Sequence, residues 1–354
     1  MKLKNLLLNS TVCKLPVKLI SVRGKDSFAL IQSLLTNNVD ALWPARKDFP
    51  SSIYGMFLSL NGRVIFDTIL YSSNESNEMN LYLECHISEI NPMLAHLKKY
   101  RMRKKAYDKC ESLHSIEIVM RAEINLESSS VYGVIENSFS CDLSTILNDQ
   151  RNDFTLSEDP RAPKEGLKRL VVFDHSDDSI SSTIDTGASS VDLYTEKRYE
   201  LGIAEGPGEI VRNKALPLNY NVDLMNGVSF SKGCYLGQEL TARTHHTGVI
   251  RRRVFPVELS KPIPSPTTTS LSSTEGGDQI EQSEGSAAGG PSHLNLPIFT
   301  RGEGDGEGGV KMGNLVCSLG TKGLAMLRVD HEPDVPLQIL SDTLLIPRRP
   351  FWNK

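Results

Sequence analysis

The most distinctive stretch of this 354-residue sequence is SKGCYLGQE, residues 231–239. Its two glycines, Gly233 and Gly237, bracket Cys234, so the backbone can turn sharply and present the thiol at a loop. Lys232 lies two residues before the cysteine, and a nearby cation favours the thiolate, the form that attacks electrophiles and binds metals. A helix that begins near Gly237 would point its first N–H groups back at this loop. The competing interpretation is a cysteine buried behind a glycine turn.

The next segment, LTARTHHTGVI at residues 240–250, contains the adjacent histidines His245 and His246. On an extended chain two adjacent side chains point to opposite faces, so the pair is a poor bidentate metal site. Either histidine could act as a base for Cys234, as in cysteine hydrolases, but no third orienting group accompanies them. The three arginines at residues 251–253 favour a solvated strand edge, with anion binding as the lesser alternative.

Composition narrows the class of protein. Hydrophobic residues make up 39% of the chain and charged residues 23%, as is typical of a soluble globular protein. The net charge of −4 gives no reason to expect nucleic acid or an anionic membrane as the main partner. No apolar run approaches the roughly 18 residues of a membrane-spanning helix. The six cysteines are far apart with no CxxC pair, which argues against a zinc knuckle or a self-contained ferredoxin-type cluster.

The order of the expected strands and helices indicates an α+β fold. Residues 53–60 and 63–71 flank Asn61-Gly62, the strongest two-residue signal for a hairpin turn. A strand is expected at 17–22 and helices at 27–35 and 93–100, so the sheets should be antiparallel or mixed rather than doubly wound. The basic cluster at residues 98–105 is a solvated rim or, alternatively, an anion site.

Two segments of the chain have an unusual composition. Residues 1–25 contain no acidic residue, and the leucines near the start suit an amphipathic transit peptide over residues 1–14; a frayed basic terminus is the alternative. From 261 to 309 the chain is rich in Pro, Ser, Thr, Gly and Glu, so we expect a disordered insert. β-like segments flank this insert, which predicts one small C-terminal β-domain with a long loop rather than an interdomain linker.

Residues 232–239 match the signature K-G-C-Y-x-G-Q-E, and the chain thereby resembles the folate-binding YgfZ/GcvT family. Residues 240–250 are similar to the mitochondrial iron–sulfur cluster assembly factors within that family. Further similar pieces occur in order along the chain: LLTNNV (34–39), NGR (61–63), DTILY (67–71), YRMR (100–103), DPR (159–161), LPL (216–218) and GLAMLR (323–328).

The resemblance implies a fold like that of the glycine-cleavage T-protein. Residues 15–250 would form a folate-binding-like α+β region of two subdomains with mixed or antiparallel sheets, and residues 251–354 a small β-barrel. It further implies a mitochondrial matrix protein that promotes maturation of four-iron–four-sulfur proteins with A-type scaffold partners. Cys234 would then be a ligand to a transiently shared cluster, and a partner protein would supply the other thiolates.

The resemblance also assigns candidate site residues. The cluster or partner contacts would be Lys232, Gly233, Cys234, Tyr235, Gly237, Gln238 and Glu239, with Arg243, His245 and His246 as secondary candidates. Tetrahydrofolate is the implied cofactor, and its candidate contacts are Asp67, Tyr100, Arg101 and Arg103. True aminomethyltransferases carry adjacent aspartates where this chain has Phe66-Asp67. A conventional enzyme is therefore not expected, and a tetrahydrofolate-dependent aminomethyltransferase-like activity is the alternative function.

Overall fold

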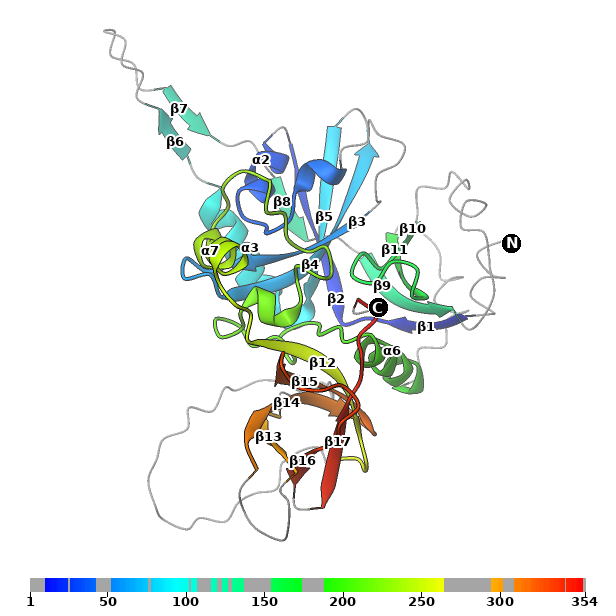
Figure 1. Ribbon diagram of the computed structural model, residues 1–354. Helices are drawn as coiled ribbons and strands as arrows, with labels where there is room; N and C mark the ends of the chain where they lie inside the picture. The colour runs from blue at the N-terminus through cyan, green and yellow to red at the C-terminus, as the bar shows by residue number, and fades with distance from the viewer. Residues whose placement is uncertain are drawn as a thin grey trace, which may run out of the picture.

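The computed structural model describes most of the chain. The residues that it describes are 10–24, 26–42, 52–75, 78–101, 103–106, 116–119, 123–126, 129–136, 154–173, 188–263, 294–301, 309–340 and 342–352. Two antiparallel sheets lie together at one end, and a closed barrel lies at the other (Figure 1). The α+β class, the antiparallel sheets and the C-terminal barrel are as expected.

The five-stranded sheet contains the predicted hairpin. Its strand order is β3 (Ser52–Leu58), β4 (Val64–Glu75), β5 (Glu78–His86), β2 (Val17–Arg23) and β8 (Glu123–Leu126). Along β4, Phe66 and Leu70 enter one hydrophobic core, whereas Ile69 and Tyr71 enter the other. Successive side chains of a strand point to opposite faces, so Asp67 lies on the face of Ile69. Helices α2 (Ser27–Gln32) and α3 (Ile90–Tyr100) cover the Phe66 face.

The second sheet has the strand order β1 (Ser10–Lys14), β9 (Ser129–Glu136), β11 (Leu167–Phe173) and β10 (Phe154–Glu158). Helix α6 (Ala188–Glu200) packs on it, with the ring of Tyr194 against Gly133 of β9. β1, which falls within the expected transit peptide 1–14, pairs along its length with β9 and buries Cys13. Residues 1–9 lie outside the described residues.

The barrel is closed by β12 (Arg252–Leu259), β15 (Lys322–Arg328), β14 (Lys311–Leu319), β13 (Leu296–Thr300), β16 (Leu337–Leu340) and β17 (Thr343–Pro347). β13 lies inside the range 261–309, so the expectation of an uninterrupted disordered insert is wrong there. Ile298 is fully buried in the barrel core, and β13 pairs with β14 and β16. Residues 264–293 and 302–308 lie outside the described residues.

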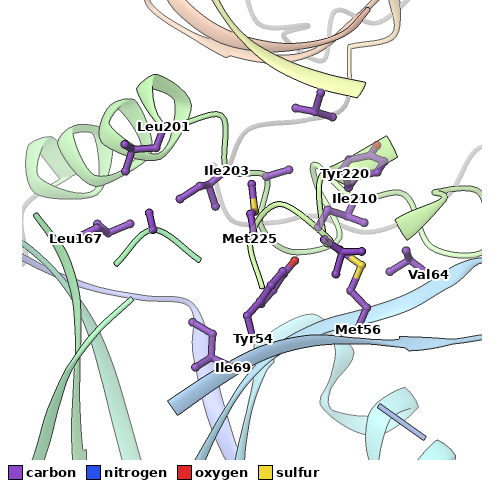
Figure 2. Packing of buried hydrophobic residues seen from close by; sticks show 14 of the residues in the cluster. Tyr54, Met56, Val64, Ile69, Leu167, Leu201, Ile203, Ile210, Tyr220 and Met225 are labelled. Carbon is purple, nitrogen blue, oxygen red and sulfur yellow. The ribbon is translucent and has the colours of Figure 1, made fainter. Parts of the chain in front are cut away.

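A large hydrophobic core joins these three parts. Figure 2 shows Tyr54, Met56 and Ile69 of the five-stranded sheet facing Ile203 and Met225 of the segment that follows α6. This segment includes a short 3-10 helix, η3 (Pro217–Tyr220), and ends at helix α7 (Gln238–Thr247). The core thus fixes the backbone on both sides of residues 231–239. No helix in the described part of the chain is long and apolar enough to cross a membrane.

The short strands β6 (Arg103–Ala106) and β7 (Ile116–Val119) pair with each other and project away from the sheets in Figure 1. The helix expected at 27–35 ends three residues early, at Gln32, and two 3-10 helices, η1 (Val39–Leu42) and η2 (Ile87–Glu89), complete the region.

Candidate functional site

Cys234 lies exposed on the loop before α7, as expected. Three other cysteines are described, Cys13, Cys85 and Cys317, and all are buried. Burial raises the pKa of Cys13 and of Cys85 to about 12, and it raises the pKa of Cys317 well above its ordinary value. These three thiols are therefore protonated and shielded, which leaves Cys234 as the accessible thiol among the described residues.

Gly237 determines where the loop ends and α7 begins. Its φ is +76°, and a Cβ there would collide with the carbonyl oxygen of Ser59 and lie 2.8 Å from the Cβ of Leu58. Only glycine fits such a position without strain. The backbone N–H of Tyr235 donates to the Oε1 of Gln238 at 3.2 Å, which closes the turn. The helix predicted to begin near Gly237 is confirmed.

The side chain of Lys232 forms hydrogen bonds with the backbone of the first half of the chain. Its ammonium donates to the carbonyl oxygens of Gln32 at 2.7 Å, Leu35 at 2.7 Å and Asn37 at 2.8 Å. It also lies 5.1 Å from the centre of the Tyr235 ring, and burial lowers its pKa to about 8. An ammonium has three N–H donors, and all three are engaged with backbone carbonyls at the end of α2 and just after it. Lys232 therefore holds the loop.

His245 and His246 lie on helix α7, so the extended geometry considered for this histidine pair does not apply. The His245 ring stacks on Phe230 with centroids 3.5 Å apart, and the His246 ring stands perpendicular to it at 4.9 Å. Within the described chain neither imidazole hydrogen-bonds to Cys234, so the geometry gives no support to a cysteine hydrolase. The exposed Glu239 and Arg243 pair with each other one turn apart.

The arginines at 251–253 lie in two different environments. Arg253 is tied to Asp223 by two hydrogen bonds of 2.8 and 2.7 Å, so it is structural. Arg251 and Arg252 are exposed where β12 begins, as a solvated strand edge requires.

A second polar region lies in the interior, beside Asp67. The Asp67 carboxylate accepts the backbone N–H of Gly206 at 3.2 Å. Burial, followed by the negative charge of Glu205, raises the pKa of Asp67 to about 6. Glu205 itself binds the guanidinium groups of Arg161 at 2.7 Å and Arg169 at 2.5 Å. Although burial raises the pKa of Glu205, these two cations outweigh it and hold that pKa well below its usual range.

Sequence reasoning missed most of this interior network. It includes a bidentate Asp159–Arg161 pair and a bidentate Arg198–Glu209 pair. The signal that could have found it is a charged residue inside an apolar run, such as Arg169 in LKRLVVF or Glu205 in GIAEG. Arg169 is buried, and its Nη1 has no hydrogen-bond partner among the described residues. This spare donor and the Asp67 carboxyl fit a polar heterocycle such as a pterin, which they could hydrogen-bond.

Among the other folate candidates, Tyr100 is not beside Asp67. Tyr100 ends α3 and packs on His96 at 4.9 Å between ring centroids, and His96 lies against Phe66 on the opposite face of β4. Arg101 is exposed just after α3, and the side chain of Arg103 lies outside the described residues. The alternation along β4 therefore separates Tyr100 from Asp67 by the thickness of the sheet.

Two antiparallel sheets beside a closed barrel define the fold class of the protein, which is that of an aminomethyltransferase T. The solved structure of the glycine cleavage system aminomethyltransferase T from Bartonella henselae is similar, with a TM-score of 0.62 over 100% of this chain and 88% of that one. The two sequences are 12% identical, so this likeness concerns the fold alone. No family model matches the chain.

Curated relatives identify the family. The chain is 31% identical over 337 residues to the iron–sulfur cluster assembly factor IBA57 homolog, mitochondrial, of Coccidioides immitis, which covers 90% of this chain and 71% of the relative. It is 35% identical over 254 residues to the human iron–sulfur cluster assembly factor IBA57, mitochondrial, over 70% of this chain and 65% of the relative. The chain belongs to the IBA57 family of iron–sulfur cluster assembly factors.

Proposed function

We propose that the protein assists iron–sulfur cluster assembly in the mitochondrial matrix, and that Cys234 contacts a cluster held jointly with a partner. The observation that carries this proposal is the contrast among the described cysteines: Cys234 is exposed, whereas Cys13, Cys85 and Cys317 are buried. Family membership supports the assembly function, and the relatives named above are called mitochondrial.

The partner must supply most of the ligands. No group of three or more His, Cys, Asp or Glu in the described residues could hold a metal ion. Iron–sulfur clusters are usually held by four thiolates, so one exposed cysteine is an incomplete ligand set. An A-type scaffold protein that carries a cluster on its own cysteines would complete it, and four-iron apo-proteins would be the recipients. In this scheme the cluster is the cargo, and Cys234 is a transient ligand.

The test is anaerobic cluster transfer. A cluster-loaded A-type scaffold is mixed with apo-aconitase and the purified chain, and recovery of aconitase activity is followed over time. We expect Cys234→Ser to slow recovery to the rate without the chain. Ser231→Ala, which changes an exposed hydroxyl in the same loop, is the matched control and should act like wild type. Transfer by Cys234→Ser at the wild-type rate would remove the thiol from the mechanism.

A folate-dependent one-carbon transferase is the second candidate, favoured by Asp67 and the spare donor of Arg169. Tetrahydrofolate, when bound there, would supply the amine that accepts a one-carbon unit. The carboxyl of Asp67 could bind and orient it, but Phe66 contributes no second charge. The test is turnover of a methylamine-type donor with tetrahydrofolate by wild type and Asp67→Asn. Turnover that depends on Asp67 would favour this activity; binding without turnover would leave folate as a ligand only.

A further inference from the structure

The guanidinium of Arg212 donates no hydrogen bond within the described part of the chain. Its Nε is buried without a partner there, and its Nη1 lies 4.0 Å from the Oε1 of Glu89, which is too long for a hydrogen bond. The Arg212 side chain is 38% exposed, so a solute can reach it. A guanidinium carries five N–H donors in a planar fork that matches the oxygens of a phosphate or a carboxylate. Arg212 therefore has donors to offer to an anion from solution.

Backbone pairing holds Arg212 against an aromatic ring. The N–H of Asn213 donates to the carbonyl of Val64 at 2.8 Å, and the N–H of Val64 donates to the carbonyl of Ala215 at 2.9 Å. This pairing places Arg212 beside β4, where its guanidinium carbon lies 4.7 Å from the centre of the Phe66 ring. Because the ring already restricts the guanidinium, less side-chain freedom is lost when an anion binds to it.

Positive charge from helix α3 converges on the same place. His96 of α3 packs on the Phe66 ring with 5.9 Å between centroids, and its Nε2 is buried without a hydrogen-bond partner among the described residues. Burial, followed by the positive charges of Arg212 and Lys99, lowers the pKa of His96 to about 4. Both cations therefore lie close enough to act on one imidazole. Lys99 is exposed, with its ammonium 5.4 Å from the centre of the Tyr100 ring.

Acidic groups do not balance these cations. Residues 90–107 include six lysines and arginines and no acidic residue. Burial raises the pKa of Glu89 to about 7, although Arg212 lowers it, so this carboxyl is only partly ionised near neutral pH. The lysines in the last turn of α3 also complement the helix dipole. Arg212 belongs to a different segment, between α6 and η3, so the dipole does not account for it.

We propose that Arg212 and Lys99, beside His96, form a binding site for a phosphate monoester, carried either by a small metabolite or by the headgroup of phosphatidic acid. The Arg212 fork binds two phosphate oxygens, and Lys99 supplies the second positive charge. A phosphate monoester is close to doubly charged at neutral pH, so it suits two cations better than a carboxylate does. The site lies on the Phe66 face of the five-stranded sheet, opposite the face of Asp67, and does not depend on the proposed function.

The first experiment titrates inorganic phosphate into the full chain at pH 7.5 and follows the imidazole resonances of His96 by NMR, assigned from their loss in His96→Gln. Phosphate should shift them saturably, and chloride at equal ionic strength should not. Arg212→Gln should weaken binding by about tenfold or more, because hydrogen bonds to a charged group are lost. Glu89→Gln should tighten binding, since it removes the competing carboxylate. Arg328→Gln, which changes an exposed arginine of the barrel, is the matched control and should bind like wild type.

A second experiment distinguishes the two sources of the phosphate group. Glycerol 3-phosphate replaces inorganic phosphate in the NMR titration, and flotation compares vesicles of phosphatidylcholine with and without phosphatidic acid. A saturable shift without flotation indicates a small ester, whereas flotation that requires phosphatidic acid and Arg212 indicates the lipid. Arg212→Lys keeps the charge but not the fork, so it should bind more weakly than wild type while it melts like wild type in circular dichroism. The site is refuted if neither phosphate nor vesicles bind, or if Arg212→Gln binds as well as Arg328→Gln.

Discussion

Replacing Lys232 by Met tests how the cysteine loop is held. The ammonium of Lys232 donates three hydrogen bonds of 2.7 to 2.8 Å to backbone carbonyls at the end of α2 and just after it. A hydrogen bond from a charged donor contributes at least about 1.5 kcal/mol, so three amount to about 4.5 kcal/mol. Burial of the ammonium opposes this, as its lowered pKa of about 8 indicates. We therefore expect Lys232→Met to reduce the free energy of unfolding by about 2 kcal/mol.

Lys232→Met should loosen the cysteine loop more than it destabilises the whole fold. The backbone N–H of Leu236 donates to the carbonyl of Ser33 at 2.9 Å, and that of Ser229 donates to Thr36 at 3.0 Å. These bonds lie on either side of the lysine contact, so loss of the ammonium should free the loop between them. We expect faster hydrogen exchange at Leu236 and a changed rate of Cys234 alkylation. Both rates are measured on the purified chain. Urea unfolding measures the free energy of unfolding of the whole protein.

Lys214→Met is the control, because Lys214 is an exposed lysine of the same region. It should leave unfolding, exchange and alkylation unchanged. Lys232→Arg should recover part of the loss, since a planar guanidinium cannot direct three donors from one nitrogen. The reasoning is refuted if Lys232→Met matches wild type in the unfolding free energy and in exchange at Leu236.

Further predictions concern the interior and the loop boundary. Arg198→Met should cost about 3 to 5 kcal/mol in denaturant unfolding, because it leaves the buried Glu209 carboxylate unpaired; a loss below about 1 kcal/mol would contradict this. Folding raises the pKa of Asp67 from 3.8 to about 6, so its ionisation destabilises the fold: the penalty is absent below pH 3.8 and complete above about 6. Asp67→Asn should accordingly stabilise the chain by about 1 to 2 kcal/mol at pH 7.5 but not at pH 4, and an equal effect at both would contradict it. Gly237→Ala should lower stability by about 2 kcal/mol or more, because φ is +76° and the Cβ meets Ser59; an unchanged melting temperature would refute it.

Local chemistry made much of the fold predictable. Asn61-Gly62 between two β-rich runs predicted a hairpin, and β3 and β4 pair through that turn. Gly237 predicted a helix start nearby. In the structure α7 begins at the next residue, and Gly237 has the left-handed backbone conformation that glycine adopts easily. β13 was missed because its short sequence, LPIFT, lies within a stretch that is dominated by small and polar residues. Composition averaged over the whole insert concealed a strand that only its barrel neighbours β14 and β16 stabilise.

The candidate site shows where sequence reasoning stops. Cys234 was found because its surroundings are unusual at the level of neighbouring residues, but the role of Lys232 depends on carbonyls about two hundred positions earlier, at Gln32, Leu35 and Asn37. Nothing in the local pattern distinguishes a lysine that activates a thiol from one that holds a helix end. The distinction matters for mechanism. A cation beside the sulfur would change its reactivity, whereas a lysine bound to the backbone changes where the sulfur is. In the proposed scheme Lys232 presents the thiol, because a loop that is held in place lets Cys234 meet a cluster on another protein without rearranging.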